Sequence, residues 1–300
     1  MALLRAEGSK VQLANMMSIL TRIGLGGIAC GANLVCASTS EAQSLAPKFK
    51  VVAFYTARSD QAHISFVQEA NRWFPEMALR HGFAYEATTN WSQLNPEFLS
   101  QFPVVIFLDT RPDDAAQRKT FQKYMERGGA WMGFHFAAFA LTPSSYPQNW
   151  DWYHNQFLGS GEYLSNTWRP TSAVLRVEET NHPAVAHLPL TFSSSPNEWY
   201  RWKVDLRTNP DIKILLAIDP ASFPLGTGPK PHEIWHSGYY PVVWTNNKYR
   251  MLYFNMGHND IDYEHNTRQE LSLTFTSEVQ NKLILDGLLW LGSGKLEQRP

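Results

Sequence analysis

Residues 127–137 read RGGAWMGFHFA: two glycines, a short apolar run and then a histidine, His135. The glycines are typical of a helix end and the apolar run of a buried strand, so His135 is predicted to stand at the carboxyl end of a strand. In open α/β sheets, ligands bind beyond these ends, and a sharp turn from strand to helix lifts one side chain toward them. We expect Gly133 to permit that turn and His135 to be the side chain it presents.

The segments before this stretch alternate between strand and helix patterns. Compact apolar runs predict strands at 49–55, 83–88, 103–108 and 130–134. Helical spacing predicts helices at 64–80 and from Asp113 or Asp114 to about Arg127. Strands that alternate with helices imply right-handed crossovers, and therefore an α/β fold with a doubly wound, mostly parallel sheet.

The chain changes character from about Leu141, where prolines become frequent and helical patterns rare. Seven of the eleven tryptophans lie between 150 and 244, at positions 150, 152, 168, 199, 202, 235 and 244. Further strands are predicted at 173–177, 212–218, 242–244 and 251–254, and a final helix at 279–291. We interpret this half as Trp-rich loops and short strands that elaborate the carboxyl edge of a single domain.

The composition describes an ordinary globular protein. Of the 300 residues, 44% are hydrophobic and 18% are charged, which is enough apolar material for a well-buried core. The net charge is -1 and no basic face is evident, so the sequence gives a nucleic-acid partner no electrostatic support.

The N-terminus is predicted to be a secretory signal peptide. Basic residues precede a mostly apolar run at 23–37, which is short for a membrane span, and Ser40-Glu41-Ala42 offers a cleavage site. The expected organisation is a signal peptide at 1–42, a linker at 43–48, the domain at 49–292 and a tail at 293–300. The mature protein would then be exported to the periplasm or outside the cell, without stable membrane insertion. A start at Met16 or Met17, or a lipoprotein modified at Cys30 or Cys36, are alternatives.

Both cysteines of the sequence, Cys30 and Cys36, lie within this predicted leader. The mature chain would therefore contain no disulfide. It would also lack the thiolate that a glutamine amidotransferase uses as its nucleophile, which excludes that activity.

Several motifs resemble the trehalose-utilization (ThuA-like) family, which is related to the class I glutamine amidotransferases. That family's elbow, Gly-x-Cys-x-Gly, corresponds here to residues 133–137, with histidine at the nucleophile position. The other matching segments, in the family's order, are His63, 181–183 (NHP), 197–200 (NEWY), 241–244 (PVVW) and 250–258 (RMLYFNMGH). The resemblance covers roughly residues 50–292 and implies a flavodoxin-like sheet and a role in carbohydrate utilization.

The chain departs from the family at two further places. Asn197 precedes Glu198 where the family usually has aspartate, which removes one carboxylate. Residues 166–170 (NTWRP) contain no histidine, although the family often has one ahead of its central strand.

Four residues are candidates for catalysis. His135 can act as a general acid, a general base or a metal ligand, or it is a core histidine bonded to backbone. His258 and Asp260 have the His-x-acid spacing of the amidotransferase triad, or they belong to an ordinary polar loop. Glu198 would position a sugar hydroxyl or act as an acid, or it pairs with Arg201.

A divalent metal is a further expectation, although the sequence identifies no cofactor. His63 follows the first strand and should approach the same sheet edge as His135 and His258. Three histidines with Glu198 or Asp260 would suffice for zinc or another divalent ion, but no local His-x-His spacing supports one.

Sugar binding is expected from the aromatic residues. Trp150, Trp152, Trp199 and Tyr200, together with His63, are candidates for contacts with a carbohydrate, because aromatic rings have apolar faces and polar tips. The alternative for each ring is a place in the core.

The leading hypothesis is an exported enzyme that converts a disaccharide or keto-sugar derivative, as an isomerase, lyase or hydrolase. His135 and His258 would supply its acid and base. The alternative is an exported carbohydrate-binding protein without turnover.

Overall fold

The computed structural model describes residues 46–58, 60–167, 170–223, 235, 237–258 and 272–294. These residues belong to one compact unit that begins at Leu45. The predicted signal peptide and residues 295–300 lie outside the described residues. None of the described helices is both long and apolar enough to cross a bilayer.

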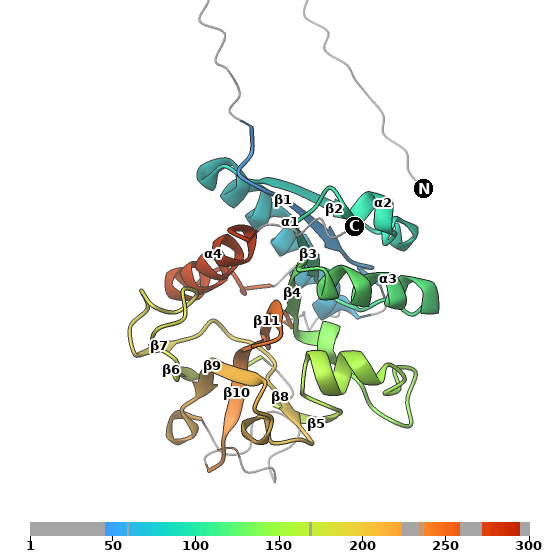
Figure 1. Ribbon diagram of the computed structural model, residues 1–300. Coiled ribbons are helices and arrows are strands. Elements are labelled where there is room, and N and C mark those ends of the chain that lie inside the picture. The colour runs from blue at the N-terminus through green and yellow to red at the C-terminus, as the bar shows by residue number, and fades with distance from the viewer. Residues whose placement is uncertain are drawn as a thin grey trace, which may run out of the picture. The chain divides into compact units, whose positions relative to one another are not determined.

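A nine-stranded mixed sheet organises the molecule (Figure 1). In spatial order its strands are β2 (Ala84–Thr88), β1 (Lys50–Phe54), β3 (Val104–Phe107), β4 (Ala130–Phe134), β11 (Tyr249–Phe254), β10 (Tyr240–Asn246), β9 (Ile212–Ile218), β6 (Val174–Val177) and β7 (Thr191–Ser193). The strands from β2 to β11 run parallel to one another, and the pairings from β11 through β10, β9 and β6 to β7 are antiparallel. A second, two-stranded sheet pairs β5 (Tyr163–Asn166) with β8 (Tyr200–Trp202).

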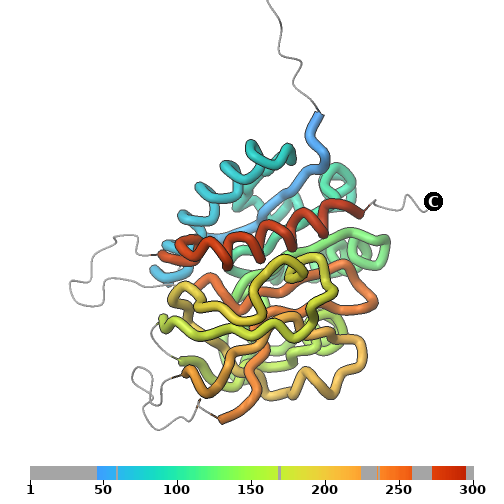
Figure 2. Tube along the Cα trace, turned by 90° about the vertical axis from the view of Figure 1, so that its left-hand side faces the viewer, coloured from blue at the N-terminus to red at the C-terminus, as the bar shows by residue number. Residues whose placement is uncertain are grey.

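Helices cover both faces of the parallel half. On one face lie α1 (Gln61–His81) and α4 (Glu278–Gly292), which run side by side (Figure 2). The other face carries α2 (Pro96–Leu99), α3 (Ala115–Glu126) and a π-helix, η3 (Trp152–Phe157). Successive residues of β1 alternate between the two cores, as a doubly covered strand requires. The predicted fold class is confirmed.

The predicted helices and strands occur close to their expected bounds. Asp60 caps the start of α1 and Gly82, with φ 74°, ends it, while Asp114 caps α3. The sequence patterns did not predict the short helices α2 and η3, the single-turn 3-10 helices or the short strands β5, β7 and β8. The three strands are short and mix polar with apolar residues, so no compact apolar run marks them.

Gly133 does not make the turn after β4, so that expectation was wrong. It lies inside β4, and a Cβ there would come 2.0 Å from the ring of Trp131 two residues earlier on the same face. The glycine therefore makes room for a buried tryptophan. The turn itself is carried by His135, whose φ is 38°.

Candidate functional site

His135 occupies the elbow between β4 and the short 3-10 helix η2 (His135–Ala138). Its left-handed backbone is rare for a residue with a side chain and costs on the order of 1–3 kcal/mol. The hydroxyl of Tyr253 donates to the carbonyl of His135 over 2.8 Å and helps to hold this turn. The ring is 1% exposed, so the elbow points it into the protein, where it meets other polar groups.

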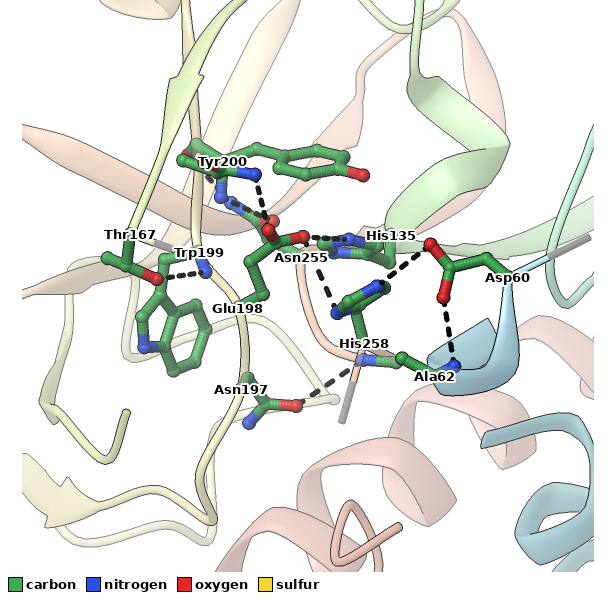
Figure 3. A network of polar contacts seen from close by, with 12 residues as sticks. Asp60, Ala62, His135, Thr167, Asn197, Glu198, Trp199, Tyr200, Asn255 and His258 are labelled. Carbon is green, nitrogen blue, oxygen red and sulfur yellow. Dashed lines mark hydrogen bonds and ion pairs between the residues drawn. The ribbon is translucent and has the colours of Figure 1, made fainter. Parts of the chain in front are cut away.

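Glu198 stands at the centre of those groups (Figure 3). Its Oε2 lies 3.2 Å from Nε2 of His135 and 3.5 Å from Nδ1 of His258, and its Oε1 accepts a hydrogen bond from Asn166. Arg201, the alternative partner considered for Glu198, lies over the rings of Trp235 and Tyr240 instead. Glu198 is therefore a buried carboxylate shared by two histidines.

Asp60 extends this arrangement toward solvent. Its Oδ2 lies 3.5 Å from Nε2 of His258, while its Oδ1 accepts from the backbone of Ala62 as the cap of α1. The side chains of His135, Glu198, His258 and Asp60 thus form one continuous polar chain, with Asp60 half exposed at its outer end. The sequence patterns did not indicate Asp60. An acidic residue that follows the first strand and precedes the first helix is a typical helix cap, and this position could have indicated it.

His63 completes the predicted convergence of three histidines. It lies in the first turn of α1, with its ring centre 4.7 Å from that of His258 and 5.9 Å from that of His135. Its Nε2 is buried without a hydrogen-bond partner among the described residues. The carboxyl ends of β4 and β11 and the start of α1 therefore meet at one point.

Backbone contacts hold the loops that carry Glu198 and His258 against each other. The amide of Glu198 donates to the carbonyl of His258 over 3.0 Å, and Oδ1 of Asn197 accepts from the amide of Gly257 over 3.3 Å. Nδ2 of Asn197 donates to the carbonyl of Ser195. The contact between the two loops uses the amide oxygen of Asn197, which an aspartate could also supply. Only the bond to Ser195, within its own loop, needs the N–H that asparagine has and aspartate lacks.

The electrostatics favour neutral rings at His63 and His135 beside ionised carboxylates at Glu198 and Asp60. Burial lowers the pKa of His135 to about 4, and its hydrogen bond to the Glu198 carboxylate offsets this only in part. Burial, and then the charge of His258, lower the pKa of His63 well below its usual value. Burial alone would raise the pKa of Glu198 and Asp60, but His258 and its neighbouring histidines lower both. At neutral pH the site can accept protons or bind a cation.

Two overlapping groups of side chains could hold a metal ion: Asp60 with His63 and His258, and His135 with Glu198 and His258. In each group the ligand atoms lie within 4.8 Å of one another. The buried Nε2 of His63 and Nδ1 of His135 have no partner within the described part of the chain, and neutral imidazole with carboxylate suits zinc and similar divalent ions. A bound ion would polarise a carbonyl or hydroxyl group of a ligand.

A pocket of about 430 Å³ opens beside this cluster, at the carboxyl ends of β1, β3 and β4. Asp60 and His63 line it, together with Phe136 from the elbow and Tyr146 from the following loop. Its volume is within the range of roughly 300–1,000 Å³ typical of small-molecule sites. The inner residues His135 and Glu198 lie behind Asp60 and His258 as seen from this pocket.

The structure places the predicted tryptophans in the core. The rings of Trp150 and Trp152 stack on Tyr153 and Phe157 at 4.5 and 5.0 Å, under the face that carries α3. Trp199 is fully buried and donates to the carbonyl of Thr171. These three rings are not brought to the pocket, and packing accounts for them.

Tyr200 does join the site. Its ring lies against that of His135 at 3.8 Å, and its backbone N–H and C=O both pair with the side chain of Asn255.

Asp260 and Trp168 lie outside the described residues. His182 accepts from the amide of Ala184, which is the turn chemistry expected of the NHP segment.

A half-sheet of parallel strands, a strained elbow after β4 that carries a histidine, and a histidine–carboxylate cluster at the carboxyl ends of these strands together make up this site. The family model for ThuA, trehalose utilisation, matches residues 50–290, and the chain belongs to that family.

Two solved structures are similar over most of the chain. A putative ThuA-like protein from Bacteroides uniformis ATCC 8492 is 34% identical with a TM-score of 0.71, covering 82% of this chain and 92% of that one. A putative ThuA-like protein from Parabacteroides merdae ATCC 43184 is 17% identical with a TM-score of 0.55, covering 85% and 93% respectively. No curated protein matches the sequence.

Proposed function

We propose that this protein is an exported enzyme that converts a disaccharide or a keto-sugar derivative by proton transfer. The observation that carries the proposal is the polar chain from His135 through Glu198 and His258 to Asp60, which ends beside the pocket. Family membership in trehalose utilisation supports a sugar as substrate. Export rests on the leader pattern of residues 1–42.

Within this proposal, His258 exchanges a proton with the substrate and Glu198 holds the imidazole in position. A neutral histidine beside a carboxylate is a competent general base, and after protonation it becomes the acid for the second half of an isomerisation or an elimination. His135, joined to the opposite side of the Glu198 carboxylate, keeps that carboxylate ionised and in place. Glutamine hydrolysis is not proposed, because it needs a cysteine nucleophile and the elbow holds histidine. The two cysteines of the sequence, Cys30 and Cys36, both lie in the predicted leader.

The alternative is an exported carbohydrate-binding protein without turnover. The specific observation in its favour is that the ring of His135 is 1% exposed, and that neither His135 nor His258 is among the described residues that line the pocket. In that case the cluster would stabilise the fold around a binding pocket.

Variants of the two histidines separate these proposals. We expect His258→Ala to lower the rate of conversion of keto-disaccharides by about 10²–10⁴-fold, the range typical of general acid–base catalysis, while sugar affinity stays within a few-fold. His135→Ala should lower the rate less. His187→Ala is the control, because His187 is exposed and outside the cluster. A wild-type protein that binds sugars but converts none of them would establish the binding alternative.

A further inference from the structure

The pocket beside the histidine cluster has an aromatic side, and this side differs from the tryptophans that the sequence suggested. Phe136 and Tyr146 both line the pocket, and their rings meet edge to face at 4.8 Å and 87°. Both are half-buried, so part of each ring remains available to a ligand. The ring of Phe139 stacks behind Phe136 at 4.8 Å and 10°, which supports it from the protein side.

This aromatic side is continuous with the cluster. Phe136 is the residue after the elbow histidine, and its ring centre lies 4.7 Å from that of His63. A ring-shaped ligand that packs on Phe136 and Tyr146 therefore has its next atoms beside His63 and Asp60, the two cluster residues that line the pocket. Binding surface and reactive groups form one site.

The charges of the pocket select among sugars. Its lining includes three aspartates, Asp60, Asp109 and Asp113, against one arginine, Arg58. Asp109 is 4% exposed and is occupied in holding the loop after β1, because it accepts hydrogen bonds from Thr56 and Ala57. Asp60, which also faces His258, and Asp113, which pairs with Arg118 at 3.5 Å, are exposed and can accept hydrogen bonds from sugar hydroxyls. A phosphate or carboxylate on the ligand would meet this acidic lining and be repelled.

We propose that Phe136 and Tyr146 form the sugar-binding platform of this pocket, and that the pocket takes a neutral, unphosphorylated glycoside. The inference rests on the proposed function, since it assigns the substrate class of the same site. The apolar face of the sugar packs on the two rings, and its hydroxyls donate to Asp60 and Asp113.

Calorimetric titration of the protein from residue 43 onward tests the platform with trehalose, maltose, sucrose and cellobiose as probes. We expect at least one to bind, and Tyr146→Ala to weaken it by about tenfold, the equivalent of 1.4 kcal/mol. Tyr146→Phe should retain binding, because it keeps the ring. Tyr239→Ala is the matched control, since Tyr239 is another half-buried tyrosine but lines a different pocket.

Specificity for neutral sugars is tested with trehalose 6-phosphate, which should bind more weakly than trehalose. The Asp113→Asn variant should show a smaller difference in affinity between the two sugars. Absence of binding by every neutral probe at millimolar concentration, or equal affinity in wild type and Tyr146→Ala, would overturn the inference. The two proposals fail in different ways. Sugar binding that depends on Tyr146, without any conversion, would contradict only the proposed enzymatic activity. Conversion that His258→Ala abolishes and Tyr146→Ala leaves unchanged would contradict only the aromatic platform.

Discussion

His135 combines a strained backbone with a buried ring, and both follow from its place directly after the central strand. The sequence around it predicted the strand end and the emerging histidine, because an apolar run after two glycines is a local pattern. It did not predict that the histidine itself adopts the left-handed conformation, since the neighbouring Gly133 was the obvious residue for that. Only the packing of Trp131 reveals why the glycine is needed elsewhere.

Another buried histidine leads to a prediction about acid stability. His154, in η3, is fully buried, and neither ring nitrogen has a partner within the described residues. Burial, and then the charge of Arg111, lower its pKa to about 3. The folded state therefore disfavours the protonated ring, whereas the unfolded chain takes up the proton near pH 6.5. The stability that depends on a neutral His154 is present above pH 6.5 and is lost as the pH falls toward 3.

We expect His154→Phe to remove this part of the acid sensitivity while filling similar space. Between pH 7 and pH 4.5 the wild type should lose about 2–3 kcal/mol more unfolding free energy than the variant, as a shift of this size implies. Urea unfolding at the two pH values measures the difference. Parallel losses in both proteins would show that His154 is protonated without cost in the folded state.

At the scale of elements, the start of α1 serves both the fold and the site. Asp60 caps the helix with one carboxylate oxygen and faces His258 with the other. Asp60→Ala removes both contacts, so we expect it to lower the unfolding free energy by about 0.5–2 kcal/mol and to reduce sugar conversion. Asp60→Asn can still cap, and should retain most of the stability while losing the charge beside His258.

Asp114 provides the matched control for this prediction. It caps α3 through hydrogen bonds from the amides of Ala116 and Gln117, and it lies outside the histidine cluster and the pocket lining. Asp114→Ala should cost a similar amount of stability and leave conversion unchanged. If the Asp60 and Asp114 variants lose activity alike, the effect of Asp60 is merely structural.

The elements also show which parts of the site the sequence could indicate. His63, His135 and His258 each follow or adjoin a clear strand pattern, and parallel strands bring such positions to one edge. Asn166 ends the four-residue strand β5 and Tyr146 lies in a loop, and the positions of both depend on long-range packing, so no local pattern marks them. Trp150, Trp152 and Trp199 were predicted to line a pocket because the sequence shows how many aromatic residues a segment has. It does not show whether their side chains face the core or the pocket.

At the scale of the whole molecule, a bound cation would act on stability as well as chemistry. An ion held only by the folded state raises the melting temperature in proportion to the logarithm of its concentration. We expect zinc, added to protein freed of metal by a chelator, to raise the melting temperature of the wild type. His258→Ala should respond least, because His258 belongs to both candidate ligand groups.

Elemental analysis of the untagged protein from residue 43 onward provides the direct check. A metal content near one ion per chain, lost in the His258→Ala variant, would make His258 a ligand rather than the base of the proposed proton transfer. Equal zinc stabilisation of wild type and variant would place the ion elsewhere, and no stabilisation by zinc or manganese would leave metal-free histidine chemistry.

The pairing of β4 with β11 has a consequence for when the chain can fold. Residues 130–134 lie in the middle of the sheet, yet one neighbour of β4 is made of residues 250–254, which are synthesised more than a hundred residues later. Until that segment emerges, the central strand keeps an open edge, and contacts so distant in sequence form slowly. Under the proposed export, this delay would matter for transport. The same strand that brings His258 to the elbow would keep the unfinished chain unfolded enough to pass through a membrane.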